Sequence, residues 1–328
     1  MKKIINNPNN VVTEMLLGLA KANPDLYYSD GLEVISRKNK SGKVGVISGG
    51  GSGHEPAHAG YVGEGMLDAA VAGNVFSSPS PNRIIEGIKR ADSGSGVLMI
   101  IKNYSGDIMN FRLAAEMAEM NGHKVDSVIV KDDVAVPDST FSAGRRGIAG
   151  TVFVHKIAGA AAQKGYSLED VKRVAEKAIA NVRSMGLAMS PCILPAVGKP
   201  GFILAENEME IGMGIHGEPG IKRTEMVSAD EMASILLNTI LDDYDFADSE
   251  TALLVNGLGA TPLMELYILN NAVNNLLDQK GIKVYRNLVG NYVTSLEMSG
   301  CSISLLKLDN ELKELLDAPC KTTAFTIA

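Results

Sequence analysis

Apolar residues in the first part of the chain alternate between helical spacing and short runs typical of buried strands. Residues 11–22 carry apolar side chains at helical spacing, and the run 43–48 is typical of a strand. The same succession then repeats, which predicts a sheet with parallel strands and helices between them. The further elements expected here are a helix over 81–91, a strand over 96–102, a helix over 108–121 closed by Gly122, and a strand over 124–130.

A long loop over 132–150 separates this region from a second one that is richer in strands. Two helices follow the loop, and Ser167 with Asp170 caps the second of them. A later helix carries a capping box of Ser228 and Glu231. The last elements expected are a strand over 251–259, a helix over 261–279 with Thr261 as its cap and Pro262 at its first position, and strands over 283–290 and 302–309.

The length of the chain predicts two domains, because 328 residues exceed the size at which single hydrophobic cores usually stop growing. We predict an α/β fold made of two α/β domains with largely parallel or mixed sheets flanked by helices. The N-terminal domain is expected over 1–185 and the C-terminal domain over 186–328. A hydrophobic share of 45% and a charged share of 21% are typical of soluble globular proteins.

Charge and cysteine content narrow the possible partners and location. The net charge of −7 and the lack of a basic block argue against a nucleic acid or an anionic membrane as partner. No apolar run reaches the roughly 20 residues of a membrane span, and the first residues lack the apolar segment of a signal peptide. The three cysteines are odd in number and have no metal-ligand spacing, so we expect a cytoplasmic protein without a metal site.

A glycine-rich segment over 48–56 follows the strand expected at 43–48. Its bare backbone N–H groups are suited to wrap a polar small molecule, and His54 at its end can exchange a proton near neutral pH. The carboxyl ends of strands in open α/β sheets are where ligands bind. An ordinary tight turn with a structural histidine is an alternative of about equal weight for such a short motif.

A second polar segment, over 101–107, follows the strand expected at 96–102. In one interpretation Asp107 is only the N-cap of the next helix and Lys102 a solvated charge at the end of a strand. In the other, both strands end at the same edge of one sheet, so that Lys102, Asp107 and His54 converge on a ligand.

A third segment, over 212–220, holds His216 between glycines. It contains a formal G-x-G-x-x-G, but Pro219 and Gly220 break the helix that a dinucleotide-binding motif requires. A neutral imidazole held in such an exposed loop is a competent nucleophile toward a carbonyl group. The sequence contains neither a Walker A motif nor the glycine-rich and catalytic loops of protein kinases, and nothing in it points to ATP binding.

The remaining histidines have structural interpretations. His123 follows the glycine that closes a helix and is expected to contact water, and His155 lies on a helix as a surface or packing residue. His58 stands four residues after His54, the spacing of a metal pair on a helix. Pro56 between them and the lack of a carboxylate partner argue against that pair.

Taken together, these segments resemble, in order and spacing, the dihydroxyacetone kinase K subunit family. The resemblance extends over nearly the whole chain and is far more specific than any single motif. The strings that carry it are SGGGSGHEPAHAGYVGEGM, IIKNYSGDIMNF, DDVAV, GRRGIAGTV, GIHGEPG, GATPLMELY and GCSISLLKLDNELKELLDAP.

The resemblance implies a homodimer of two-domain α/β subunits and a specific chemistry. The histidine of GIHGEPG, here His216, is implied to form a covalent hemiaminal with the carbonyl carbon of dihydroxyacetone. Asp107 and His54 are then implied to be the general base and acid, so the catalytic residues expected are His216, His54 and Asp107. The substrate-binding residues that the family's motifs imply are Gly51, Ser52, Gly53, His54, Lys102, Asp107 and His216.

The resemblance also implies partners. Family members that use ATP directly carry a further nucleotide-binding domain, so this chain is expected to be the substrate-binding subunit of a phosphoenolpyruvate-dependent kinase. An ADP-binding L-type subunit, rephosphorylated by an M-type subunit of the phosphotransferase system, is expected to supply the phosphate. ADP or ATP and magnesium would be bound by that partner, and no cofactor by this chain. Dihydroxyacetone is the expected substrate, with glyceraldehyde as a second candidate.

Two other functions remain open at this level. A ketone-sensing paralogue could serve as coactivator of a transcription regulator, although it would have less use for the acid–base pair of Asp107 and His54. A fatty-acid carrier on a related fold would require a long apolar pocket and would not need a nucleophilic His216.

Overall fold

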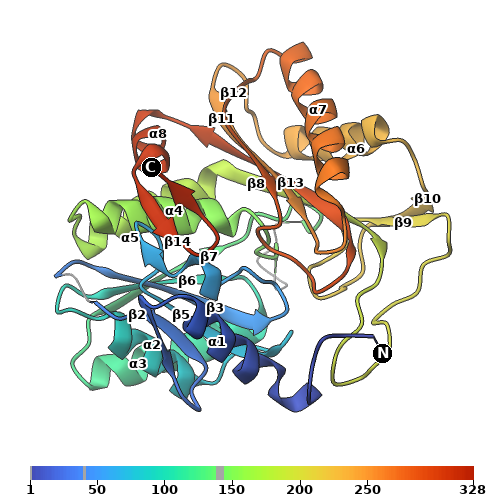
Figure 1. Ribbon diagram of the computed structural model, residues 1–328. Coiled ribbons are helices and arrows are strands. Elements are labelled where there is room, and N and C mark those ends of the chain that lie inside the picture. The colour runs from blue at the N-terminus through green and yellow to red at the C-terminus, as the bar shows by residue number, and fades with distance from the viewer. Residues whose placement is uncertain (1, 40–41, 138–143) are drawn as a thin grey trace. The chain divides into compact units, whose positions relative to one another are not determined.

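The computed structural model describes residues 2–39, 42–137 and 144–328 and divides the chain into two compact units (Figure 1). Unit 1 comprises Met1–Val130, Phe153–Ile179 and Glu314–Ala328, and unit 2 comprises Lys131–Val152 and Ala180–Lys313. Both units contain a sheet flanked by helices, which confirms the α/β architecture. The units are interleaved along the chain, whereas the sequence analysis placed one boundary after residue 185.

The sheet of unit 1 is mixed. Its six strands lie in the order β1-β2-β5-β3-β6-β7; β5, β3, β6 and β7 are parallel, and β2 is antiparallel to both of its neighbours, β1 and β5. The central strands β3 and β6 are buried along their whole length, as expected of parallel strands covered on both faces. The strands are β1 Leu26–Ser29, β2 Val34–Arg37, β3 Gly45–Ser52, β5 Ala69–Val75, β6 Val97–Lys102 and β7 Val125–Val130.

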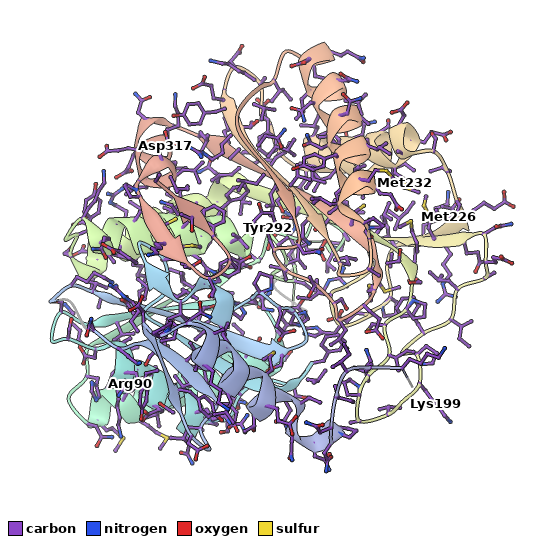
Figure 2. The ribbon with its side chains drawn as sticks, in the orientation of Figure 1. Arg90, Lys199, Met226, Met232, Tyr292 and Asp317 are labelled. Carbon is purple, nitrogen blue, oxygen red and sulfur yellow. The ribbon has the colours of Figure 1, made fainter. Side chains whose placement is uncertain are left out.

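Helices α1 (Val11–Ala22), α2 (Pro81–Ala91) and α3 (Ser105–Met120) also belong to unit 1. The apolar sides of α2 and α3 share one core with the sheet, in which Ile84 and Phe111 are fully buried. On α2 lies Arg90, which is labelled in Figure 2. Its guanidinium group lies 4.0 Å from the ring centre of Tyr27, and its Nε donates to Ser36 Oγ at 3.1 Å. These contacts tie the helix to the first two strands.

The rest of unit 1 is assembled from distant stretches of chain. A small sheet joins β4 near residue 63 to the strands at the end of the chain, in the order β15-β14-β4. On α4, the buried Lys156 donates to the carbonyl oxygen of Leu315 at 2.6 Å. The elements that lie wholly or partly here are η1 Pro8–Asn10, η2 Ala59–Tyr61, β4 Gly63–Glu64, α4 Thr151–Gln163, α5 Leu168–Asn181, α8 Asn310–Asp317, β14 Cys320–Thr322 and β15 Thr326–Ile327.

The sheet of unit 2 is mostly antiparallel, with order β10-β9-β8-β13-β11-β12 and one parallel pair, β11 with β12. Helices α6 and α7 lie side by side and share one core with it, in which Leu236 and Val273 are fully buried (Figure 1). The elements are β8 Val182–Ser190, β9 Glu208–Ile211, β10 Lys222–Glu225, α6 Ala229–Asp243, β11 Glu250–Gly257, α7 Leu263–Gln279, β12 Lys283–Gly290 and β13 Ser299–Leu308.

Several helix ends lie where the sequence predicts them. Ser167 Oγ accepts from the backbone N–H of Asp170, and Ser228 and Glu231 form the expected capping box at α6. Gly122, in the left-handed region with φ of 85°, follows the end of α3. These ends depend on contacts within a few residues, which is why they can be read from the sequence.

The expected cap at Thr261 is wrong. Helix α7 begins at Leu263, with Pro262 at the N-cap position and no side-chain cap. The Thr261 hydroxyl instead donates to the carbonyl oxygen of Gly300 at 2.6 Å and accepts from the N–H of Gly300 at 2.9 Å. The hydroxyl group that could have capped the helix is therefore engaged in a long-range hydrogen bond with β13.

His123 has a partner that the sequence did not predict, because its Nδ1 lies 2.6 Å from Asp92 Oδ2. His155 is a packing residue, fully buried with its ring against those of His58 and Tyr61. Among the residues that the structure describes, no helix is long and apolar enough to cross a membrane.

We predict that Ser228→Ala will loosen the first turn of α6 without unfolding the protein. Loss of an N-cap costs about 1 kcal/mol, which corresponds to roughly fivefold faster amide exchange where local opening governs it. Hydrogen exchange followed by mass spectrometry on peptides that cover residues 226–236 measures the effect. Glu231→Gln is the matched control, because glutamine also completes a capping box; equal exchange rates in wild type and Ser228→Ala would contradict the role of Ser228.

Candidate functional site

The glycine-rich segment is packed closely against the chain that follows β5. A Cβ at Gly51 would lie 2.6 Å from the backbone nitrogen of Ser77, a distance that real contacts do not reach. Gly53 has a φ of 104°, in the region that favours glycine. The hydroxyl of Ser52 donates to the carbonyl oxygen of Gly73 at 2.8 Å. Positions 51–53 are therefore fixed in place. A side chain at Gly51 would clash with neighbouring backbone, and a side chain at Gly53 would strain the backbone.

Gly50 is different, because its Cα faces polar side chains and not backbone. A Cβ there would lie 3.5 Å from Lys102 Cε, 3.6 Å from Asp107 Oδ2 and 3.6 Å from His58 Nε2. Lys102 is 1% exposed, Asp107 3% and His58 7%. The side chains of Lys102, Asp107 and His58 thus surround the position that a side chain at Gly50 would occupy.

The topology of the sheet explains why Lys102 and Asp107 meet there. Strand β6 runs parallel to β3, with Gly49 opposite Ile101, so Lys102 at the end of β6 lies at the same edge as Gly50. Helix α3 begins two residues after Asn103, and Asp107 is its third residue. The N-cap position belongs to Tyr104, so Asp107 is not the N-cap that the alternative interpretation required.

His54 lies in the same segment and is fully buried. Its ring stacks on Phe76, with 5.1 Å between ring centres and an interplanar angle of 16°. Next to it, Glu55 Oε1 accepts from the N–H of Gly53 at 3.0 Å, and burial raises the pKa of the Glu55 carboxyl. The imidazole of His54 is therefore held at the end of the segment by stacking.

His58 lies next to Ser48 of the glycine-rich strand. Its Nδ1 is 3.2 Å from Ser48 Oγ, and its ring meets the ring of His155 edge-on at 5.2 Å. Burial, followed by the positive charge of Lys102 and the two other imidazoles His155 and His54, holds the pKa of His58 well below its usual range. Within the described residues, no group of three or more His, Cys, Asp or Glu side chains could hold a metal ion.

In unit 2, Glu218 holds His216 from two directions. One carboxylate oxygen accepts from the backbone N–H of His216 at 2.9 Å, and the other lies 2.8 Å from its Nδ1. Burial alone would raise the pKa of Glu218, but the hydrogen bonds and charge of His216 outweigh it and lower the pKa to about 2. An ionised carboxylate can only accept, so Nδ1 carries a proton, and in the neutral form of the imidazole the lone pair is on Nε2.

The loop around His216 is anchored by charged side chains of the same unit. Arg146 Nη2 donates to the carbonyl oxygen of Gly212 at 2.8 Å and forms an ion pair with Asp133 at 2.7 Å. Glu210 Oε1 accepts from the N–H of Gly220 at 2.7 Å. The GRRG segment thus has a positioning role in this loop that its sequence did not reveal.

The structure places the predicted site residues in both units. Gly51, Ser52, Gly53, His54, Lys102 and Asp107 lie in unit 1, and His216 lies in unit 2. Two residues that the sequence analysis did not select are close to predicted ones: His58, whose pKa burial lowers, is near enough to Lys102 and His54 for them to lower it further, and Glu218 bonds to His216. Their proximity in sequence to His54 and His216 was the only available signal, and it does not reveal a side-chain direction.

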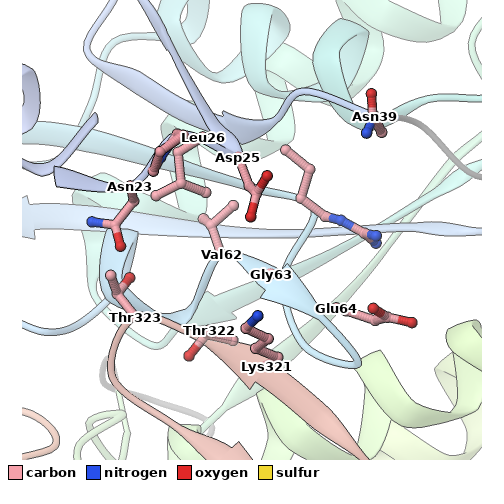
Figure 3. A pocket seen from close by; sticks show the side chains of 12 residues that line it. Asn23, Asp25, Leu26, Asn39, Val62, Gly63, Glu64, Lys321, Thr322 and Thr323 are labelled. Carbon is pink, nitrogen blue, oxygen red and sulfur yellow. The ribbon is translucent and has the colours of Figure 1, made fainter. Parts of the chain in front are cut away.

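Unit 1 also contains a surface hollow of about 340 Å³ beside β14 and β4 (Figure 3). Asp25, Glu64, Lys321 and Thr323 are among the side chains around it. Its described lining includes no residue of the segment 48–56. Mixed charges without a convergent set of buried groups make this hollow a weaker candidate for chemistry than the surroundings of Gly50.

Comparison with known proteins identifies the family. Residues 17–324 match the model of the Dak1 domain. The chain is 53% identical over 329 residues to the dihydroxyacetone-binding subunit of PTS-dependent dihydroxyacetone kinase 1 from Listeria innocua, covering 99% of this chain and all of that protein.

Two solved structures are also similar. A dihydroxyacetone kinase operon co-activator has a TM-score of 0.91 and 38% identity, covering 96% of this chain and 98% of its own. The dihydroxyacetone kinase from C. freundii, in complex with AMP-PNP and Mg²⁺, has a TM-score of 0.91 and 34% identity, covering 99% of this chain and 61% of its own. The chain is therefore a member of the Dak1 domain family, to which the dihydroxyacetone kinase K subunits belong.

Proposed function

We propose that this chain is the dihydroxyacetone-binding subunit of a phosphoenolpyruvate-dependent dihydroxyacetone kinase. In this proposal the chain captures the ketone covalently on His216 and presents a hydroxyl group for phosphorylation to dihydroxyacetone phosphate. The observation that carries the proposal is the orientation of His216, whose Nδ1 is occupied by Glu218 so that Nε2 bears the lone pair. The 53% identity with a dihydroxyacetone-binding subunit supports the choice of ketone.

Capture begins with attack of the Nε2 lone pair on the carbonyl carbon. The C–N bond forms as the C=O π bond breaks, and the carbonyl oxygen takes a proton from solvent to become the hydroxyl of a hemiaminal. The imidazole becomes cationic during the attack, and the Glu218 carboxylate beside Nδ1 stabilises that charge. Hydroxyl contacts alone would discriminate weakly against glycerol, whereas covalent capture requires a carbonyl.

Phosphoryl transfer then needs a proton to leave the attacking hydroxyl. We assign Asp107 as the general base and His54 as the acid, with Lys102 and the segment Gly51–Gly53 binding the substrate. The burial of Asp107 next to Lys102 supports this assignment, because a carboxylate and a cation out of water exert strong effects on a nearby hydroxyl.

The phosphate donor in this proposal is a separate ADP-binding L-type subunit, recharged by an M-type subunit of the phosphotransferase system. The nucleotide and its magnesium are assigned to that partner. We also expect the chain to act as a homodimer and to accept glyceraldehyde as a second candidate substrate. The Listeria relative is one subunit of its kinase, which supports a separate partner protein here. That kinase is PTS-dependent, which supports the phosphotransferase system as the source of the phosphate.

A second function is favoured by one observation, the likeness to a co-activator structure with a TM-score of 0.91. In that case the chain would capture the ketone and contact a transcription regulator without transferring phosphate. The buried Asp107 favours the kinase subunit, because ketone sensing requires His216 but no general base.

We predict that the purified chain converts the carbonyl carbon of [2-¹³C]dihydroxyacetone from a ketone to a tetrahedral centre, visible by ¹³C NMR. His216→Ala should abolish this signal, because the attacking nitrogen is lost. His123→Ala, which removes a histidine paired with Asp92, is the matched control and should keep the signal. A tetrahedral adduct that persists in His216→Ala would refute covalent capture by this residue.

We predict that Asp107→Asn leaves ketone capture intact while turnover falls by about 10²–10⁴-fold, the usual contribution of a general base. The adduct is measured by ¹³C NMR and turnover by dihydroxyacetone phosphate formed with the ADP-bound partner and a phosphoenolpyruvate-fed relay. Unchanged turnover would reduce Asp107 to a structural residue.

We predict that Glu218→Gln weakens ketone capture roughly tenfold, because a neutral amide stabilises the cationic imidazole less than a carboxylate does. KM for dihydroxyacetone should rise while kcat changes little, since the proton-transfer groups remain in place. Glu225→Gln on the exposed strand β10 is the control for loss of one negative charge. If both variants behave alike, Glu218 has no specific effect on His216.

The kinase and coactivator functions are separated by one assay. Product formation by wild type, and none by His216→Ala, supports the kinase subunit. Ketone capture by wild type without product, in the presence of the charged partner, supports the coactivator.

A further inference from the structure

The segment 214–218, which carries His216, folds back on itself. The backbone N–H of Gly214 donates to the carbonyl oxygen of Glu218 at 3.0 Å, and the N–H of Gly217 donates to the carbonyl oxygen of Gly214 at 3.0 Å. The Glu218 side chain returns to the same segment, where Oε2 accepts from the backbone N–H of His216 at 2.9 Å and Oε1 lies 2.8 Å from its Nδ1. The orientation of the imidazole therefore depends on a carboxylate that the segment itself supplies.

Gly214 lies unusually close to that carboxylate. A Cβ at this position would be 2.0 Å from Glu218 Oε2 and 2.7 Å from Glu218 Cδ, closer than atoms approach in real structures. Oε2 is also the atom that binds the backbone N–H of His216. The carboxylate thus occupies the place where any residue other than glycine would put the first atom of its side chain.

The backbone of Gly214 does not itself require glycine, because its φ lies outside the left-handed region. The three atoms nearest to a Cβ at this position all belong to the side chains of Glu218 and Arg146. Gly220 is different, since a Cβ there would lie 2.2 Å from the carbonyl oxygen of Ile211. An alanine at position 214 is therefore compatible with the backbone, provided that a side chain moves.

The side chain that moves is the carboxylate and not the guanidinium. A Cβ at Gly214 would lie 2.6 Å from Arg146 Nη1, so this nitrogen and Glu218 Oε2 are within about 4.6 Å of each other. Arg146 is anchored outside the segment, because its Nε donates to the buried Asp133 at 2.7 Å and its Nη2 to the carbonyl oxygen of Gly212 at 2.8 Å. Both described hydrogen bonds of the Glu218 carboxylate lie within its own segment.

We propose that Gly214 is a positioning residue for ketone capture, because the absence of a side chain at this point admits the carboxylate that orients His216. Gly214 acts through Glu218 and takes no part in bond formation. The proposal rests on the proposed function, since capture by His216 is the step that this orientation serves. All the residues involved belong to unit 2.

The competing explanation is that the fold of the loop requires glycine at position 214 for its own sake. A double-mutant cycle separates the two explanations. Glu218→Ala removes the carboxylate that a methyl group at position 214 would displace. If the methyl group acts through the carboxylate, Gly214→Ala has no further effect in that background.

Ketone capture is the first measurement, with the affinity for [2-¹³C]dihydroxyacetone determined from the tetrahedral adduct by ¹³C NMR. We expect Gly214→Ala to weaken capture roughly tenfold, because hydrogen bonds to a charged group are lost. The double variant should bind the ketone within about twofold of Glu218→Ala.

Gly201→Ala is the matched control. Gly201 is an exposed residue of the same unit, and a Cβ there would have no atom within 4 Å among the residues that the structure describes. The control should capture dihydroxyacetone as wild type does.

The tautomer of His216 provides a second measurement that needs no ketone. Long-range ¹H–¹⁵N correlation spectra at alkaline pH, with the signals of His216 assigned by their loss in His216→Ala, should show the Nδ1–H tautomer in wild type and in Gly201→Ala. Gly214→Ala should show a mixture of both tautomers, because no carboxylate then accepts from Nδ1. A glycine that serves only the fold of the loop would leave the tautomer unchanged.

Thermal unfolding tests whether the variants are folded. Should Gly214→Ala fail to fold, the double variant with Glu218→Ala decides, because removal of the carboxylate relieves the clash and should restore folding. A double variant that also fails to fold would show that the backbone requires Gly214, and the positioning role would be refuted.

The remaining outcomes distinguish this role from the proposed function. If wild type captures no ketone, the proposed function fails, and an unchanged tautomer in Gly214→Ala would then refute the orienting role as well. If wild type captures the ketone while Gly214→Ala keeps full affinity, the positioning role is refuted and the proposed function stands. An equal loss of affinity with and without the Glu218 carboxylate leads to the same conclusion.

Discussion

The glycines of β3 set the constraint on which the candidate site of unit 1 depends. A Cβ at Gly49 would lie 2.4 Å from the carbonyl oxygen of Val71, and one at Gly51 would meet the backbone at Ser77, so neighbouring chain passes both positions too closely for any side chain. Between them, Gly50 faces Lys102 and Asp107. One glycine run thus lets the backbone pack closely and also leaves room beside buried polar groups.

Burial of charge is the second common feature of the site residues. Lys102 and Asp107 are almost fully buried and lie against the same point beside Gly50, so each lowers the cost of keeping the other charged out of water. Imidazoles in the same surroundings are driven the other way, since burial and the nearby cation keep His58 neutral. The surroundings of Gly50 therefore combine a buried lysine and a buried carboxyl group with a neutral imidazole.

In unit 2, His216 is positioned by a different set of contacts. Its loop is held by Arg146 and Glu210, and its tautomer is set by a carboxylate two residues away. In the proposed function, capture of a carbonyl requires only a neutral imidazole with a defined lone pair, and the proposed specificity for ketones rests on that covalent chemistry. The likeness to both a kinase and a co-activator is consistent with this proposal, because it assigns capture and phosphoryl transfer to different residues.

The sequence by itself determined the α/β class, most helix ends and the family, because these depend on periodicity, on contacts within a few residues such as Ser228 with Glu231, and on motifs kept in order. Only the tertiary structure decided which distant groups share a bond. Thr261 bonds to β13 instead of capping α7, His123 pairs with Asp92, and His58 contacts Ser48. Side-chain direction is set by neighbours that the linear order does not bring together, and that is why the sequence selects His54 and His216 as candidates but does not reveal the contacts of His58 and Glu218.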